Sequence, residues 1–326
     1  MCRRVPFDLC IVGMVVIAFI LAGPVYAGDS NDNKPGDDKK PGDDKRREVA
    51  QDCRYDHHSS GTSSGAFPSD DVFRPLIADP KQPQFFAIWQ ARRVRTNGTS
   101  SNIGSVALGE NFGFYTKRYG CDGVQVSLLT GVFSQFNLDE PNAELINTDF
   151  NVGVPVTWRV ENWSARVRYY HQSSHVGDEF LVDHPEFKPT TFTYEEVEGI
   201  LSYDYKWARM YAGGGVLVHR EPDTLDRNRV QWGFDVRVPS IASKLGWVFE
   251  RMVVIPVLAA DFKAFEELDW IINTNLLAGM ELSRPDSIRR FRVMFNYYHG
   301  FNPYGPYGQS FSQKIESFGL GAYFLF

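Results

Sequence analysis

The sequence predicts an all-β fold, a transmembrane antiparallel β-barrel of about twelve strands. Three observations predict it. Long segments alternate apolar and polar residues, the connections between them alternate short and long, and the last segment ends the chain on a phenylalanine. A soluble β-sandwich alternates too, but its strands are usually about five or six residues long. Strand length and connection pattern therefore favour a barrel that crosses a membrane.

The N-terminus resembles a secretory signal. Arg3 and Arg4 precede an apolar run from Leu9 to Leu21, and small residues follow at Val25 and Ala27. A basic start, a short apolar run and a small-residue cleavage site predict a signal peptide over residues 1–27. The protein is therefore expected to leave the cytosol.

Residues 28–64 have a different composition. They contain the sequence KPGDDK twice, from Lys34 and from Lys40, and almost no apolar residue before Cys53. Such a segment buries too little surface to offset the entropy of ordering, which predicts a disordered periplasmic linker. The remaining residues, 65–326, are expected to form the barrel, with a short periplasmic segment before the first strand.

Two cysteines, Cys53 and Cys121, remain after removal of the signal peptide. Outside the cytosol such a pair forms a disulfide or stays as two thiols, and both alternatives are open. The net charge is −6 and no basic stripe is present, so nucleic acid is not expected as a partner.

The alternation defines each strand. From Asp149 to Val160 the even positions are apolar and the odd positions mostly polar, and the segment from Leu268 to Leu282 places Leu268 and Trp270 on the apolar face and Asp269 on the polar face. Residues two apart on a strand share a face, so each segment has a lipid side and a lumen side. The predicted strands are 84–95, 103–116, 121–134, 146–160, 163–175, 193–206, 207–219, 228–238, 250–263, 268–283, 287–300 and 313–326.

The connections sort by length. Short turns are expected at residues 161–162, 206–207 and 284–286 on the periplasmic side, and the longer connections fall on the outer side, as in bacterial outer-membrane barrels. The connection over residues 239–249 is longer than a periplasmic turn usually is. It holds a short helix, or the strand count is off by a pair.

The polar face is rich in arginine. The expected lumen arginines include Arg166, Arg168, Arg209, Arg237, Arg290 and Arg292. Acids on the same face, Asp149, Asp204, Asp235, Asp269 and Glu281, are expected to pair with them. Two interpretations follow: an anion-selective pore, or a salt-bridged interior that stiffens a narrow barrel. A barrel of this size is nearly filled by long side chains, which favours the second.

The stretch RYYHQSSHVGDEF, from Arg168, places His171 and Ser173 on the lipid face near the outer end of a strand. Neighbours on one face of a strand are about 6.6 Å apart, so an imidazole can reach a serine hydroxyl. This arrangement is typical of acyl transfer, with Ser173 as nucleophile and His171 as general base. Glu195 on the next strand, or Glu179 in the following loop, would orient the imidazole.

The outward-facing His-x-Ser resembles the site of outer-membrane phospholipase A and of the outer-membrane lipid A deacylases. The resemblance covers a few residues and implies hydrolysis of an acyl ester of a membrane lipid; calcium would enter as a cofactor by this analogy alone. Those families follow the serine with asparagine, whereas this chain has Ser174 and His175. The alternatives are a non-enzymatic barrel, a narrow pore or a structural protein, and a metal or lipopolysaccharide site at His171, His175 and Asp178.

A broader resemblance rests on the LIADP segment, Leu76–Pro80, and on the YYHQSSHVGDEF stretch. In both, the chain is similar to a family of uncharacterised bacterial outer-membrane proteins, a domain of unknown function (DUF1207). This resemblance implies a barrel in the outer membrane, lipid contact and assembly through the C-terminal strand, and names no activity.

Overall fold

The computed structural model describes residues 64–68, 70–183, 185, 192–238, 252–284, 289–305 and 313–325. The predicted signal peptide and all but the last residue of the predicted linker lie outside the described residues. Cys121 is disulfide-bonded, and Cys53 lies outside the described residues.

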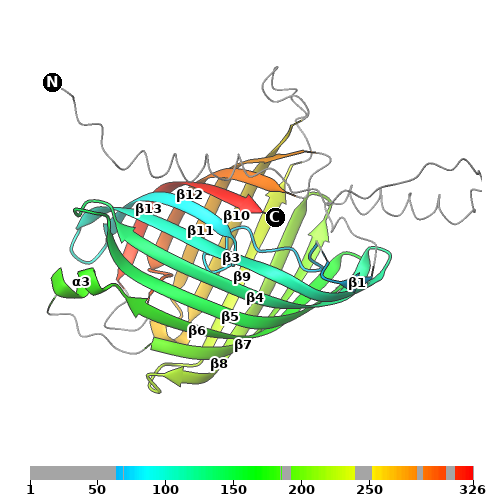
Figure 1. Cartoon of the computed structure of the whole chain (residues 1–326), viewed down its shortest axis with the longest axis horizontal. Helices are drawn as coiled ribbons and strands as arrows, with labels where there is room; N and C mark the ends of the chain where they lie inside the picture. The colour runs from blue at the N-terminus through cyan, green and yellow to red at the C-terminus, as the bar shows by residue number, and fades with distance from the viewer. Residues whose placement is uncertain are drawn as a thin grey trace, which may run out of the picture. The chain divides into compact units, whose positions relative to one another are not determined.

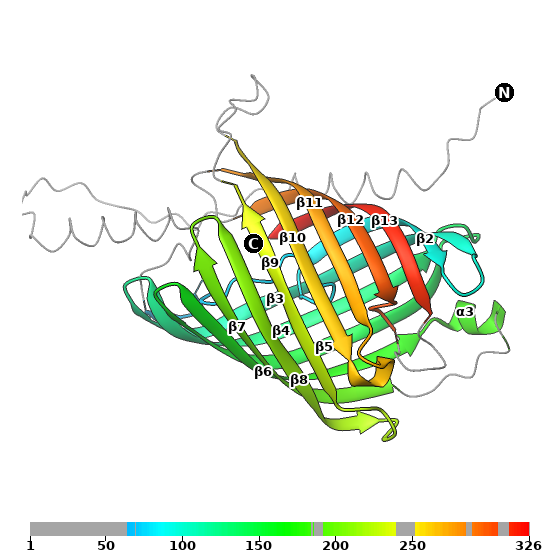
Figure 2. The ribbon, with the colours of Figure 1, turned by 180° about the vertical axis from the view of Figure 1, so that it is seen from behind.

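The described chain forms a closed antiparallel β-barrel (Figures 1 and 2). Each strand pairs with its neighbours in sequence, β13 pairs with β2, and the β3–β4 pairing closes the wall. The two-residue strand β1 pairs with β3 only. The other strands are the twelve of the predicted barrel: β2 (Phe85–Val94), β3 (Ser100–Tyr119), β4 (Asp122–Asn137), β5 (Glu144–Val160), β6 (Trp163–Val176), β7 (Phe192–Tyr205), β8 (Ala208–Glu221), β9 (Asn228–Arg237), β10 (Val253–Phe265), β11 (Ile272–Ser283), β12 (Arg290–Phe301) and β13 (Lys314–Leu325).

Three short elements were not predicted: β1 (Gly65–Ala66), the helix α3 (Asp178–Asp183) and a 3-10 helix, η1 (Glu266–Leu268). The 3-10 helix η1 moves the start of the tenth predicted strand, 268–283, to Ile272. Leu268 is buried, and Asp269 and Trp270 form a turn with φ of 54° and 58°. Asp269 is exposed, so its predicted pairing with lumen arginines was wrong. No helix among the described residues is long and apolar enough to cross a membrane.

The strands separate two faces. From Asp149 to Val160 on β5 the even residues are exposed and the odd residues are buried, as the alternation predicts. The outward side chains are largely apolar, and they include Trp89, Leu108, Phe112, Phe150, Val152, Val154, Trp158, Trp163, Tyr169, Leu201, Leu258, Met280, Phe295, Phe318 and Leu320. An apolar exterior around a polar interior is the pattern of a barrel that spans a membrane.

The two ends of the barrel differ in their connections. At one end, strands are joined by tight turns, in which Gly120, Glu161 and Lys206 have positive φ. At the other end lie the connections that contain α3 and η1 and the one that follows β12. We call the second the long-loop end.

A segment without regular secondary structure, residues 70–84, lies inside the barrel, and we call it the lumen segment. The sequence placed the chain before the first strand in the periplasm. Instead, Leu76, Ile77, Ala78 and Asp79 are 5% exposed or less, and the wall binds the segment's backbone carbonyls. Arg209 donates a hydrogen bond to the carbonyl of Pro75, and Asn275 donates one to the carbonyl of Ala78. Apolar alternation could not reveal this placement, because the segment follows no strand period.

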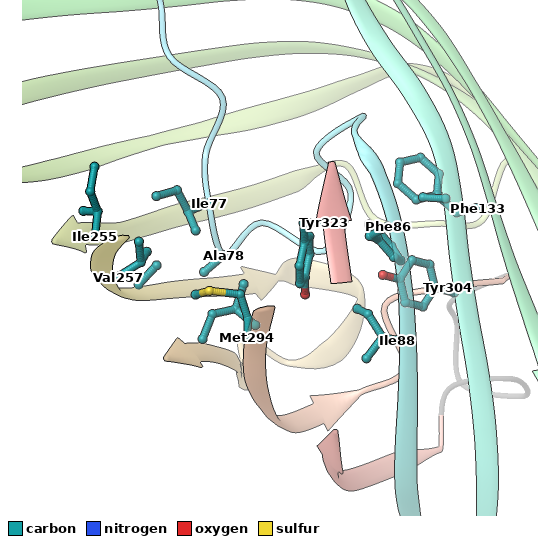
Figure 3. Close-up of a cluster of buried hydrophobic side chains, with 13 residues drawn as sticks. Ile77, Ala78, Phe86, Ile88, Phe133, Ile255, Val257, Met294, Tyr304 and Tyr323 are labelled. Atoms are coloured by element: carbon teal, nitrogen blue, oxygen red, sulfur yellow. The ribbon is translucent and has the colours of Figure 1, made fainter. Parts of the chain in front are cut away.

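Part of the interior is apolar. Ile77 and Ala78 of the lumen segment pack in one cluster with Phe86, Val257 and Met294 of the wall (Figure 3). Phe86 also stacks at a tilt on Phe133 and Tyr323. Burial of these side chains favours the inserted position of the lumen segment over release into water.

The rest of the interior is an ion-pair network. Glu198 accepts hydrogen bonds from Arg166, Arg168 and Arg229, with N–O distances of 2.6–3.1 Å. Asp204 binds Arg159 at 2.7 Å and also Arg74 of the lumen segment. Further pairs are Arg209–Asp235, Arg237–Glu281, Arg292–Glu281, Lys81–Asp149 and Lys263–Asp79. Two cavities beside the lumen segment have volumes of only about 20 and 50 Å³.

Candidate active site

His171 and Ser173 lie in β6 on the exterior face of the barrel, close to the long-loop end. Their neighbours Gln172 and Ser174 are buried on the interior face, as the alternation predicts. The apolar exterior continues below the pair at Val167. The two polar side chains therefore lie where an apolar belt meets the rim of the barrel.

Glu195 lies directly opposite His171 on the neighbouring strand β7. Its Oε1 is 3.8 Å from His171 Nδ1, and the two side chains are 33% and 44% exposed. This distance exceeds a hydrogen bond but supports an ion pair once the imidazole is protonated. Of the two predicted orienting carboxylates, Glu195 is therefore the one that faces the histidine.

A tyrosine fixes the carboxylate. Tyr169, also on the exterior of β6, donates a hydrogen bond of 2.7 Å from its hydroxyl to Glu195 Oε2. The other oxygen, Oε1, is the one nearest His171. Tyr169 thus restricts Glu195 to a rotamer that presents Oε1 to the imidazole.

The second ring nitrogen of His171 faces a threonine. Thr193 Oγ1 lies 3.3 Å from His171 Nε2 and donates to the backbone carbonyl of Gln172 at 3.1 Å. Because the hydroxyl proton is used on that carbonyl, the hydroxyl can only accept from the ring. The pattern assigns the proton of neutral His171 to Nε2.

Ser173 is half-buried and faces Phe150 on β5 and Thr193 on β7. Within the described part of the chain its hydroxyl makes no hydrogen bond. The hydroxyl is therefore available to a bound molecule, and it is not bonded to His171 in this arrangement. A general base must carry a free Nε2 toward the serine, so the site needs a ring or proton shift before it can act.

Glu179 lies apart from this group. It is in the first turn of α3, it is exposed, and it makes no ion pair with a described residue. His175 instead contacts Phe150 edge-on, with ring centres 5.7 Å apart. Among the described residues no group of three or more His, Cys, Asp or Glu side chains is placed to hold a metal ion.

The predicted lumen arginines are inside the barrel. Arg166, Arg168, Arg209, Arg237 and Arg292 are each 5% exposed or less and are paired with carboxylates. The Arg290 side chain is 37% exposed and lies 3.9 Å from Glu281. These arginines belong to the interior network and do not approach His171, which faces outward.

Sequence reasoning missed Thr193 and Tyr169 as parts of the site. Both are on the exterior alternation of their strands, but alternation alone does not say which residues lie opposite each other. The register was the missing information: Thr193 is opposite Ser173, and Val197 is opposite Tyr169.

The sequence profile of a family described as "Protein of unknown function (DUF1207)" matches residues 28–326. The chain belongs to this family. No curated protein matches it.

Solved structures of similar architecture are outer-membrane barrels. The outer-membrane phospholipase dimer with bound calcium from Salmonella typhi has a TM-score of 0.48 and 12% identity, and the match covers 78% of this chain and 94% of that chain. Outer membrane phospholipase A from Escherichia coli has a TM-score of 0.48 and 12% identity, and the match covers 74% of this chain and 93% of that chain. The β domain of a Bordetella autotransporter has a TM-score of 0.33 and 11% identity, and the match covers 75% of this chain and 98% of that chain. These are similarities of fold, and no residue role is taken from them.

Proposed function

We propose that this DUF1207 protein is an integral outer-membrane barrel that hydrolyses an acyl ester of a membrane lipid. Ser173 is the nucleophile, His171 the general base, and Glu195 the group that orients the imidazole. The exterior apolar belt contacts membrane lipid. The C-terminal strand β13, with Phe318 and Leu320 outward, is the segment that the outer-membrane assembly machinery binds.

One observation carries the proposal: a histidine, a serine and a carboxylate lie together on the exterior face. His171 Nδ1 is 3.8 Å from Glu195 Oε1, and Ser173 is the next residue on the same face of the same strand. An ester in the lipid layer meets this face without entering the lumen. Polar residues on such a face are costly unless they lie at the interface or serve a function.

The chemistry follows from these groups. Ser173 Oγ attacks the acyl carbonyl carbon, and its proton passes to His171 Nε2. The tetrahedral intermediate expels the lipid alcohol, which takes that proton, and an acyl-serine remains. Water then attacks the acyl-serine with His171 again as base, releasing the fatty acid and restoring the serine. Glu195 stabilises the imidazolium formed in both steps.

The resting arrangement must change for the first step. The proton has to move to Nδ1, where Glu195 accepts it, and Nε2 must leave Thr193 and face Ser173. Water exchanges the proton between the two ring nitrogens, and rotation about χ1 and χ2 turns Nε2 toward Ser173, because the His171 side chain is 44% exposed.

The test is fatty-acid release by the folded mature chain in detergent micelles that contain phospholipid or lipid A, with and without calcium. Ser173→Ala and His171→Ala are expected to abolish release, and Glu195→Gln to lower it by about 10²-fold or more. Ser174→Ala is the matched control, because this adjacent serine points into the barrel, where its hydroxyl has no partner among the described residues. It is expected to leave release unchanged.

Absence of release from both lipids by a folded parent barrel would reject the hydrolase. Release that persists in Ser173→Ala would assign the activity to another group or to a contaminant. Release by the parent that both substitutions remove supports the proposal and identifies the lipid class.

The second candidate is a non-enzymatic structural barrel. The filled interior favours it over a pore: the lumen segment and its ion pairs occupy the space that a conducting path requires, and the cavities beside it hold about 20 and 50 Å³. A cavity of that size holds a few water molecules.

A further inference from the structure

Arg92 differs from the other lumen arginines. It lies near the end of β2, on the interior face, and is 8% exposed. Among the described residues no carboxylate pairs with it, and its guanidinium makes no hydrogen bond; its Nε is enclosed without a partner. A buried charge without a counter-charge is costly, so this position needs an acceptor.

A second unpaired donor lies beside it. Ser317 is directly opposite Arg92 on β13, is 0% exposed, and its hydroxyl is also without a partner in the described part of the chain. Two adjacent donors that bond neither each other nor the wall can both donate to one acceptor placed between them.

Both residues line the cavity of about 20 Å³. The amide side chains on its wall are mostly engaged with one another, as in Gln90 with Asn296 and Asn302 with Gln135. One carboxylate, Asp79, also lines it, but that group is bound by Lys263. The charge left unbalanced in this cavity is therefore that of Arg92.

We propose that Arg92 and Ser317 form a binding site for a monatomic anion of the halide class inside the barrel. A cavity of about 20 Å³ has room for an occupant the size of a water molecule. A halide fits it and accepts hydrogen bonds from the guanidinium and the hydroxyl together. The site is on the interior face and does not depend on the lipid chemistry proposed for Ser173.

The test is chloride-35 NMR of the folded barrel in detergent. Saturable broadening of the chloride line, reversed by bromide, is expected for the parent. Arg92→Gln is expected to remove the saturable part, and Ser317→Ala to weaken it several-fold. Arg93→Gln is the matched control, because Arg93 is the next residue of the same strand and points outward. It is expected to retain the broadening.

A parent without saturable broadening, or an Arg92→Gln barrel that broadens the line as the parent does, would overturn the site. If Arg92→Gln does not fold, the test is anomalous diffraction from crystals of the parent soaked in bromide. An anomalous peak beside Arg92 and Ser317 supports the site, and its absence at saturating bromide rejects it.

Discussion

Glu198 is the centre of the interior network, and replacing it tests whether the barrel depends on that network. The side chain is 0% exposed and accepts from three guanidinium groups, those of Arg166, Arg168 and Arg229. Glu198→Gln removes the charge and places an amide donor against guanidinium donors. Breaking a buried ion pair from one side costs about 3–5 kcal/mol, because the partner charge remains buried. We expect a loss of that size in the free energy of unfolding.

The assay is urea unfolding of the barrel in detergent, followed by tryptophan fluorescence, with the free energy extrapolated to water. The matched control is Glu316→Gln. Glu316 pairs with Arg95 at 3.1 Å, but the two side chains are 26% and 53% exposed. Exposed pairs contribute about 0–1 kcal/mol, so the control should lose less than about 1 kcal/mol. Equal losses in the two variants would show that water screens the interior, and the argument from burial would fail.

Three further results are expected. Thr193→Val removes the hydroxyl that binds His171 Nε2, and that hydrogen bond contributes about 1 kcal/mol. Fatty-acid release should therefore rise up to about fivefold, whereas Thr193→Ser should match the parent. A fall in release in both variants would make Thr193 part of the catalytic group. Leu76→Ala, at a position that is 0% exposed, should lower the free energy of unfolding by about 2–5 kcal/mol, measured by urea titration; no loss would mean that the lumen segment is not packed in the barrel. The parent should show no steady conductance in planar bilayers, because the lumen is filled; stable single-channel steps would contradict this.

Period-two alternation was sufficient to predict the wall. All twelve barrel strands lie within a few residues of their predicted ranges, because lipid on one side and a polar interior on the other impose a strict pattern. The pattern failed where the chain leaves that geometry. The lumen segment has no strand period. At Asp269 and Trp270 the chain makes a turn, although the sequence there still alternates between apolar and polar residues.

For the candidate site, alternation predicted on which face part of its residues lie. Alternation placed His171 and Ser173 outward, and it placed Glu195 on the same face of the next strand. Which of Glu179 and Glu195 faces the imidazole depends on strand register and on the helix in the loop, and neither follows from alternation. The acids that bind the lumen arginines were foreseen in part. Glu198, which accepts from three arginines, was not among the acids predicted to pair with them.

The exterior site and the interior network are separated by the wall, and this predicts independent effects. Ser173 is half-buried and unbonded within the described chain, so Ser173→Ala should change the free energy of unfolding by less than about 0.5 kcal/mol while abolishing lipid hydrolysis. Glu198→Gln should do the reverse: it should lower stability and leave the rate per folded barrel unchanged. The double variant should show the sum of the two single losses in stability, because the two side chains share no partner. Both quantities are measured on the same preparations, by urea unfolding and by fatty-acid release. A Glu198→Gln barrel that is folded but inactive would mean that the interior positions the exterior groups, and the two faces could no longer be treated as separate.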